Sequence, residues 1–431
     1  MENTLSFEKK SLVGNDVSIA QKCIRCGYQY GIDSMLSSCT QCKGRLEYVY
    51  EGNYKGGRYP QYDSLWANLD LLPVNDPANI VSLGEGNSPI IEMEELSGLL
   101  NGARLHLMMD SEKNPTGVFK DREASIIISR CRELGLDNLV FYSTANTGRS
   151  YMHYAAQVGI TTYLFMPWQC HYKNTRHVDK KENNFIIYVD DHYPEISPFA
   201  KKFAELNGLT SVAPIHDRNE AYATVAYEQF RSLPNCRYFV QTIASGMGPI
   251  GFLKGHRNLV RFGLQEQDHI PRVICVQSSQ MNVMATAYNA GKAALHKEDL
   301  PADFPAGLYE PTLNSTNPVN NYADLCDCLQ STNGIIADAE PQFVEEVSGP
   351  ILEAFRKRGL SLRSDIEKSI LIEFAGLIKL ARLGHFEKGE DILMLACGRG
   401  RDTCTELYEP DMVINPHQCD PIELKTRLDG L

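Results

Sequence analysis

The sequence has no long hydrophobic run and no excess of positive charge. None of its apolar stretches approaches the roughly 18 residues of a membrane span, and its N-terminal segment lacks the apolar core of a secretory signal. The formal net charge is −12, without a basic stripe, so we expect no nucleic-acid partner and no membrane partner. With 431 residues, 43% hydrophobic and 22% charged, the chain has the length and composition of a globular protein with a large core.

The 13 cysteines are odd in number and mostly scattered, which argues against a framework of disulfides. Without an export signal, this pattern predicts a cytoplasmic protein with reduced thiols. Four of the cysteines form two Cys-x2-Cys pairs, twelve residues apart: Cys23, Cys26, Cys39 and Cys42. Two such pairs can turn four thiolates toward one tetrahedral ion, and Gly27 and Gly44 ease the tight turns. The spacing predicts a structural zinc ribbon at residues 18–50; four cysteines without a metal are the alternative.

Beyond residue 80, β-like segments alternate with helical ones. The β-like segments are 140–144, 161–167, 184–190, 237–244, 273–278 and 392–397. The helical segments begin at Thr147 and cover 196–207, 219–232, 342–358 and 364–383. This alternation predicts an α/β fold in which parallel sheets are covered by helices on both faces. Residues 51–80, rich in Tyr, Asn, Pro and Gly, are predicted to form a linker or an irregular arm.

The most informative segment is NPTGVFKDREA, residues 114–124. Asn-Pro-Thr-Gly predicts a turn, after which Phe119 and Lys120 open a helix. A lysine at the start of a helix lies at the positive end of the helix dipole, which favours its neutral, nucleophilic form. Such lysines form Schiff bases, although a single lysine in a first helical turn is most often a solvated surface charge.

Three further features accompany the lysine segment in a fixed order. They are SLGEGNSPI at 82–90, STANTGRS at 143–150 and the ribbon that ends in Leu-Glu-x-x-Tyr. Together they resemble the motifs of the fold-type II (tryptophan synthase β-like) pyridoxal phosphate enzymes, and within these the threonine synthases. The resemblance implies two α/β domains with the cofactor in the cleft between them, plus the N-terminal zinc ribbon. It also implies a small-molecule amino-acid substrate and a homodimer. The large domain would comprise 51–133 and 236–431, and the small mobile domain 134–235.

The resemblance also implies roles for single residues. Lys120 would carry pyridoxal phosphate as a Schiff base and move protons at the substrate carbons, with Phe119 packed beside the ring. The backbone N–H groups of one glycine-rich turn would bind the cofactor phosphate: Ser245, Gly246, Met247 and Gly248. Cys397 would face the pyridine nitrogen as a neutral thiol; a plain buried cysteine is the alternative.

The substrate carboxylate is implied to bind the STANTG loop. Its ligands would be Ser143, Thr144, Asn146 and Thr147. Asn146 would also contact the ring hydroxyl of the cofactor; an ordinary helix cap is the alternative for this loop. Arg149 would reach a second anion such as phosphate or sulfite, or it is a solvated helix arginine, and Arg122 is a further candidate anion ligand. Other candidate polar ligands are Lys173, Lys254, Asn314, Ser315 and Asn317.

Two subfamilies remain as candidates for the reaction. Threonine synthases eliminate phosphate from O-phosphohomoserine and add water at the β-carbon, whereas cysteate synthases eliminate phosphate from O-phosphoserine and add sulfite. The lysine segment, GEGNSP and the ribbon resemble the first subfamily. The segments that resemble the second subfamily are NTGRSYMHYAA, SGMG and the tail EPDMVINPHQCDPIEL.

Several residues depart from the usual threonine synthase pattern: Glu123, Ala145, Arg149, Met247 and Cys397. These departures favour a pyridoxal phosphate-dependent carbon–oxygen lyase, threonine synthase-like, with a changed leaving group or nucleophile. A secondary-metabolic replacement enzyme is one form of this hypothesis. A non-catalytic amino-acid-binding homologue is the remaining alternative, and the retention of Lys120 argues against it.

Overall fold

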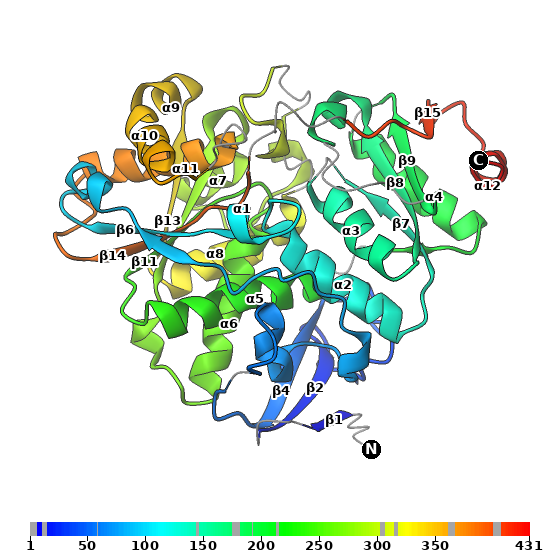
Figure 1. Cartoon of the computed structure of the whole chain (residues 1–431), viewed down its shortest axis with the longest axis horizontal. Helices are drawn as coiled ribbons and strands as arrows, with labels where there is room; N and C mark the ends of the chain where they lie inside the picture. Colours follow the sequence, from blue (N-terminus) through cyan, green and yellow to red (C-terminus); the bar gives the residue numbers. More distant parts are fainter. Residues whose placement is uncertain are drawn as a thin grey trace. The chain divides into compact units, whose positions relative to one another are not determined.

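The computed structural model (Figure 1) forms two compact units. It describes residues 7–10, 15–57, 59–143, 146–174, 182–191, 193–212, 215–301, 307–313, 318–360, 367–399 and 407–431. Unit 1 comprises residues 1–85, 120–221 and 404–431, and unit 2 comprises 86–119 and 222–403. Among the described residues, no helix combines the length and the apolar character that crossing a membrane requires.

The N-terminal part of unit 1 is a small antiparallel sheet. Its strands are β1 (Phe7–Lys10), β2 (Asp16–Cys23), β3 (Gln29–Tyr30) and β4 (Leu46–Asn53), with β2 paired to the other three. Along β4 the side chains of Leu46, Tyr48 and Tyr50 are buried, as expected where one face of a strand is covered. Both tyrosine hydroxyls donate hydrogen bonds to carboxylates of α5 (Ile215–Ser232), namely Asp217 and Glu220. The sheet is therefore fixed to the first part of α5, residues 215–221, which belongs to the same unit.

A five-stranded parallel sheet forms the rest of the unit 1 core. Its order is β10 (Thr210–Ser211), β7 (Asn138–Tyr142), β8 (Thr161–Pro167), β9 (Asn184–Val189) and β15 (Met412–Ile414). Alternate strand residues pack against α2 (Lys120–Glu133) and α3 (Asn146–Gln157) on one face. The other face packs against α4 (Tyr193–Leu206) and α12 (Pro421–Asp429). The predicted parallel sheet with helices on both faces is confirmed for this unit.

Unit 2 contains a six-stranded sheet. Its order is β13 (Ile335–Ala339), β12 (Arg272–Ser278), β11 (Tyr238–Thr242), β14 (Asp391–Leu395), β6 (Arg104–Met108) and β5 (Ile90–Glu92). All pairs are parallel except β5–β6. One face is covered by α9 (Pro341–Val347), α10 (Gly349–Lys357) and α11 (Lys368–Arg382). The opposite face is covered by α6 (Met247–Arg261), α7 (Val283–Asn289) and α8 (Val319–Ser331).

Short helices complete the two units. They are α1 (Asp110–Lys113) and the 3-10 turns η1 (Leu65–Leu71), η2 (Pro77–Asn79), η3 (Glu94–Leu100), η4 (Trp168–Lys173), η5 (Gln267–His269), η6 (Ser279–Met281), η7 (Lys297–Asp299) and η8 (Pro311–Leu313). All seven residues of η1 are buried, and the Trp66 indole donates to the Ser125 hydroxyl of α2 at 2.8 Å. This part of the predicted linker is therefore core. The domain ranges predicted from the sequence stay a prediction.

Candidate functional site

The segment before Lys120 is a turn, as predicted, and it leads directly into α2. Gly117 adopts a left-handed φ of 75°, and its N–H donates to the Asn114 carbonyl at 2.9 Å. The Asn114 amide donates to the Val118 carbonyl, also at 2.9 Å. The side chain of Asn114 thus stabilises the turn. Lys120 is the first residue of α2.

The SLGEGNSPI segment is anchored through two buried side chains. In unit 1, the Glu85 carboxylate accepts hydrogen bonds from the Leu83 N–H at 2.8 Å and from the Tyr154 hydroxyl at 2.7 Å. Burial raises the pKa of Glu85 above its ordinary value. In unit 2, the Gly86 N–H donates to the Asn114 side chain at 2.9 Å. The turn before Lys120 and the GEGNSP segment therefore share Asn114.

Lys120 lies beside a buried carboxylate. Its side chain is 22% exposed, and its Nζ lies 3.8 Å from Oε2 of Glu123, which is fully buried. Glu123 also lies 3.6 Å from Nε of Arg218 and accepts a hydrogen bond from the Thr147 hydroxyl at 3.0 Å. Sequence reasoning noted Glu123 only as a departure from a pattern, and it missed Arg218 altogether. Only the packing of α2, α3 and α5 brings these residues together.

The STANTG loop leads into α3, as predicted. The Ser143 hydroxyl accepts the Gly148 N–H at 3.0 Å, so it caps the first turn of the helix. A Cβ on Gly148 would lie 2.3 Å from a Leu164 methyl group, so a larger residue there would displace the Leu164 side chain. Thr144 and Ala145 lie outside the described residues. Asn146 is half-buried at the start of α3.

Arg149 is buried on α3, with 6% of its surface exposed. The sequence left a solvated helix arginine as the alternative for this residue, and the burial argues against that alternative. Burial and the neighbouring Arg149 charge lower the pKa of His153 to about 4, so this imidazole is neutral near pH 7. Arg122 on α2 is also buried. The remaining candidates Asn314, Ser315 and Asn317 and the side chain of Lys173 lie outside the described residues, and Lys254 is half-buried.

The predicted phosphate-binding turn connects β11 to α6 in unit 2. Gly246 is the N-cap residue of α6 with a left-handed φ of 77°, and Ser245 before it is half-buried. Met247 is buried in the first turn. A Cβ on Gly248 would lie 2.2 Å from the buried Gln241 side-chain oxygen. The backbone of this turn therefore tolerates no larger residue at either glycine without rearrangement.

Phe119 and Cys397 are neighbours within unit 2. The Phe119 N–H donates to the Cys397 carbonyl at 2.9 Å, and the Phe119 ring stacks on Tyr222 with ring centroids 4.9 Å apart. The Cys397 sulfur lies 3.5 Å from the Ser369 hydroxyl. Burial, reinforced by Glu367 and Glu373, raises the pKa of the Cys397 thiol well above its ordinary value. The thiol is neutral, as expected.

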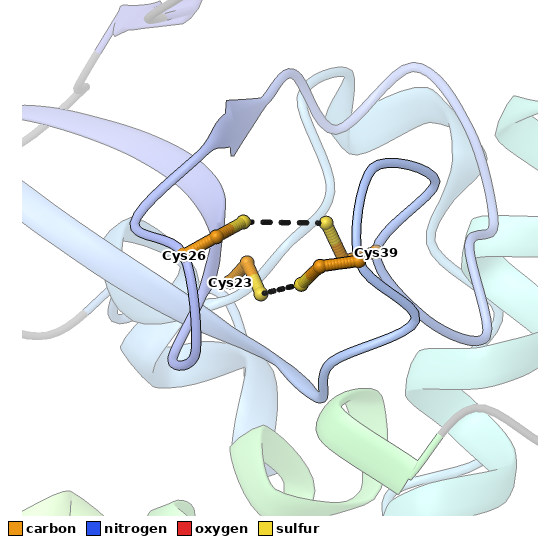
Figure 2. Close-up of side chains that lie close together, drawn as sticks. Cys23, Cys26 and Cys39 are labelled. Atoms are coloured by element: carbon orange, nitrogen blue, oxygen red, sulfur yellow. Dashed lines mark hydrogen bonds between the residues drawn. The ribbon is translucent and has the colours of Figure 1, made fainter.

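The four cysteines predicted to bind metal converge in unit 1 (Figure 2). Cys26 and Cys39 face each other with sulfur atoms 3.6 Å apart, and Cys23 and Cys42 with sulfur atoms 3.5 Å apart. All four sulfur atoms lie within 4.8 Å of one another. Four thiolates at ~2.3 Å from one tetrahedral ion would lie roughly 3.8 Å apart, so the cluster has the dimensions of a zinc site.

The two glycines of the ribbon take the positions expected of them. Gly27 has a left-handed φ of 75° and donates its N–H to the Cys23 carbonyl at 2.9 Å. A Cβ on Gly44 would lie 2.8 Å from the Cys23 sulfur. Both glycines therefore allow the backbone to fold closely around the thiols.

The residues around Lys120 and Gly246 fit a pyridoxal phosphate group. Lys120 is a partly exposed amine at a helix start, which suits a covalent bond to an aldehyde. The N-cap residue of α6 is a glycine without a capping side chain, and the start of a helix is a position where backbone N–H groups bind anions. The Gln241 oxygen finds no hydrogen-bond partner in the described part of the chain, which places a second buried polar group beside this turn.

Comparisons with known proteins agree with this chemistry. A family model described as "Pyridoxal-phosphate dependent enzyme" matches residues 81–398. Threonine synthase of Methanocaldococcus jannaschii is 27% identical over 95% of this chain and 98% of its own length. Cysteate synthase of Methanocorpusculum labreanum is 26% identical over 66% of this chain and 69% of its own.

Solved structures agree at the level of the fold. Maize serine racemase matches 74% of this chain and 90% of its own, with a TM-score of 0.55 and 15% identity. A pyridoxal 5'-phosphate-dependent aspartate racemase matches 73% of this chain and 91% of its own, with a TM-score of 0.57 and 13% identity. The fold and the sequence motifs lead to the same conclusion. The chain belongs to the family of pyridoxal-phosphate dependent enzymes, similar to threonine and cysteate synthases, as its motifs predicted.

Proposed function

We propose that this enzyme catalyses elimination and replacement on an O-phosphorylated amino acid, as a threonine synthase-like carbon–oxygen lyase. One observation carries the proposal. The threonine synthase of M. jannaschii aligns over 95% of this chain, whereas the cysteate synthase match covers 66%. The enzyme class rests on the family; the substrate is the proposed part.

The proposal assigns the cofactor to Lys120 and to the glycine-rich turn before α6. Lys120 binds it covalently, and the N–H groups of Gly246, Met247 and Gly248 bind its phosphate. When bound, pyridoxal phosphate supplies an electron sink that stabilises negative charge on a substrate carbon. Phe119 contributes an apolar surface, and the neutral Cys397 thiol donates no charge to the ring nitrogen. Lys120 moves protons at the substrate carbons.

The substrate side of the proposal involves α3. The Ser143 hydroxyl already accepts the Gly148 N–H and the Thr147 hydroxyl already donates to Glu123. The substrate carboxylate therefore binds mainly through backbone N–H groups at the start of the helix, beside Asn146. Arg149 and Arg122 supply positive charge for the phosphate leaving group.

A second reaction, β-replacement on O-phosphoserine, is favoured by one specific observation. Arg149 is buried on α3 rather than solvated, and a guanidinium is suited to bind phosphate or sulfite through paired N–H groups. Met247, in the SGMG turn that resembles the cysteate synthases, is consistent with the same candidate reaction.

The four-cysteine cluster is proposed to bind one structural zinc ion, and the enzyme to act as a homodimer. Four thiolate ligands leave no open position on the metal, so the zinc ion takes no part in the reaction. Metal analysis of the purified protein tests the first point. Replacement of Cys26 by Ser should release the metal, whereas the control Cys419→Ser, which changes a half-buried cysteine outside the cluster, should retain it.

The visible absorption spectrum of the purified protein tests the reaction. We expect an absorption band at the wavelength typical of pyridoxal phosphate bound to a lysine. The band should be absent in Lys120→Ala and present in the Lys113→Ala control. Addition of O-phosphohomoserine should shift this band and release phosphate. A shift with O-phosphoserine alone would instead establish the β-replacement reaction, and a band that survives in Lys120→Ala would refute the role of Lys120.

A further inference from the structure

A fully buried carboxylate lies one helical turn after Lys120. Glu123 has no exposed surface, whereas the side chain of Lys120 is 22% exposed. Residues three apart on a helix lie on the same face, so the carboxylate points along the side of α2 that carries the Lys120 amine. Burying a carboxylate is costly unless charged or polar groups compensate for it. The charged and polar groups around Glu123 therefore indicate the role of this carboxylate.

Those partners come from three helices of unit 1. Oε1 of Glu123 accepts a hydrogen bond from the Thr147 hydroxyl of α3 at 3.0 Å. Oε2 lies 3.6 Å from Nε of Arg218 on α5 and 3.8 Å from Nζ of Lys120. The last two separations exceed a hydrogen bond, so the attraction is electrostatic. Because Thr147 and Arg218 hold the carboxylate from outside α2, its position beside the Lys120 amine is fixed by two other helices.

Another titratable group that interacts with this carboxylate is the phenol of Tyr151 on α3. Burial raises the pKa of the Tyr151 phenol well above its ordinary value, so the phenol is neutral. Two charged groups of opposite sign are thus placed here: the negative Glu123, 3.8 Å from the Lys120 amine, and the positive Arg218, 3.6 Å from Glu123. They act on the amine in opposite directions, because a nearby negative charge favours the ammonium form and a nearby positive charge disfavours it.

We propose that Glu123 is a positioning residue for Lys120: it holds the amine toward the first turn of α3 and stabilises the charged form, while Arg218 limits this effect. The inference rests on the proposed function in one respect, namely that Lys120 is the lysine that moves protons. Glu123 does not touch the reacting carbon. It sets the pH range in which Lys120 can change between its charged and neutral forms.

The arrangement also links Lys120 to the loop proposed to bind substrate. The Thr147 hydroxyl has a single hydrogen, and it is donated to Glu123. Movement of the first turn of α3 would therefore move the carboxylate that faces Lys120. Binding of a substrate carboxylate at this turn and the charge state of Lys120 are coupled through Glu123.

The experiment measures the charge state of Lys120 directly. The full-length protein without added cofactor is labelled with acetic anhydride at a series of pH values, and acetylation of the Lys120 peptide is measured by mass spectrometry. Only the neutral amine reacts, so the pH midpoint of labelling reports the protonation of Lys120. The variants are Glu123→Gln, Glu123→Asp and Arg218→Gln. Glu133→Gln is the matched control, because Glu133 is a carboxylate at the far end of the same helix, 3.7 Å from Arg130.

We expect Glu123→Gln to lower the midpoint by about one pH unit, which is about tenfold faster labelling at a fixed pH below it. Arg218→Gln should raise the midpoint, and Glu123→Asp should restore it toward the wild-type value. Glu133→Gln should leave it unchanged. A structural role alone would not move the two midpoints in opposite directions. An unchanged midpoint in both Glu123→Gln and Arg218→Gln would overturn the proposal.

A second readout separates this inference from the proposed function. In the protein loaded with pyridoxal phosphate, the pH midpoint of the visible absorbance change should shift in the same direction in Glu123→Gln. If Lys120→Ala still holds the cofactor covalently, the proposed function is wrong, yet the labelling midpoint still decides the role of Glu123. If Glu123→Gln fails to fold, the Arg218→Gln midpoint alone decides it: an upward shift supports the proposal and no shift overturns it.

Discussion

The backbone N–H of Phe119 donates to the carbonyl oxygen of Cys397 at 2.9 Å, next to the β-bridge between Val118 and Gly398. The residue before Lys120 is thereby fixed to the chain that leaves β14. This contact uses only backbone atoms, so it does not depend on the side chain at position 397. Any effect of changing the Cys397 side chain must therefore act through the sulfur itself.

The Cys397 thiol should resist alkylation. It is buried and its pKa lies well above the ordinary value, and alkylation requires an accessible thiolate. Treatment of the folded protein with iodoacetamide at pH 8, followed by peptide mass spectrometry, should modify Cys397 at least about tenfold more slowly than the half-exposed Cys170. Rapid modification of Cys397 would show that the thiol is neither neutral nor protected.

Replacement of Gly246 by Ala should weaken cofactor binding. Gly246 has a φ of 77°, and an alanine in this conformation costs about 1 kcal/mol. Its Cβ would also lie 3.2 Å from Leu325, so the turn at the start of α6 would shift. Titration with pyridoxal phosphate should show about tenfold weaker binding, which corresponds to about 1.4 kcal/mol.

Gly263→Ala provides the matched control for Gly246→Ala. Gly263 follows the same helix, with a φ of 68° and no atom within 4 Å of an added Cβ. The control carries a similar backbone strain away from the phosphate-binding turn. It should lose a similar amount of stability and bind the cofactor normally. Equal affinities in the two variants would argue against a role of the Gly246 turn in binding.

Local signals explain what the sequence could predict. The turn at Asn114–Gly117, the helix that begins at Lys120 and the glycine-rich turn before α6 depend on residues close together in the chain. The long β-branched strands β7, β8, β9, β11, β12 and β14 were also recognisable. By contrast, β15 has three residues, and its identity as a strand depends on pairing with β9. Periodicity in so short a segment carries little information.

The charged cluster around Lys120 could not be predicted for the same reason. Glu123 was recognisable as unusual, but Arg218 lies on α5, far away in the sequence. The two meet only because α2, α3 and α5 pack together within unit 1. Residues 51–80 were misread because Tyr, Asn, Pro and Gly are frequent there, although η1 buries Trp66 completely. The amino-acid composition predicted the irregular backbone of this segment but not its burial.

Replacement of Arg130 by Met should destabilise unit 1. Arg130 is fully buried on α2, and its guanidinium donates to the backbone carbonyls of Ile32 and Ser34, the latter at 3.0 Å. Its Nε also lies 3.5 Å from the Asp217 carboxylate. Loss of one partner of a buried ion pair costs about 3–5 kcal/mol, which chemical denaturation followed by circular dichroism can measure.

Arg132→Met is the control for this change, because Arg132 is an exposed arginine on the same helix. It should alter the free energy of unfolding by less than about 0.5 kcal/mol. The Arg130 variant should in addition lose metal to a chelator faster than the wild type, since Ile32 and Ser34 lie between the two cysteine pairs. Equal stability of the two variants would mean that the ribbon and α2 are not coupled through Arg130.

The stability of the Glu373→Gln variant should depend on pH in a defined direction. Glu373 is fully buried on α11, and burial raises its pKa well above the ordinary value. The Thr242 hydroxyl has two acceptors within reach. The backbone carbonyl of Ser369 lies 2.7 Å away, and Oε2 of Glu373 lies 3.2 Å away. The carboxyl group is thus held in its neutral form, which glutamine imitates in shape and charge.

The sign of this effect follows from proton binding. Below a pH of about 4.3 the carboxyl group is protonated in both the folded and the unfolded chain, so it adds no pH dependence. As the pH rises further, the unfolded chain releases the proton while the folded chain keeps it, so wild-type stability falls by up to about 1.4 kcal/mol per pH unit. The Gln variant escapes this loss. Its free energy of unfolding should therefore increase relative to wild type between pH 4 and pH 7.

The control is Glu387→Gln, which changes an exposed carboxylate. Its free energy of unfolding should differ from that of the wild type by the same amount at every pH. The same constant difference for Glu373→Gln would mean that Glu373 is ionised in the folded protein.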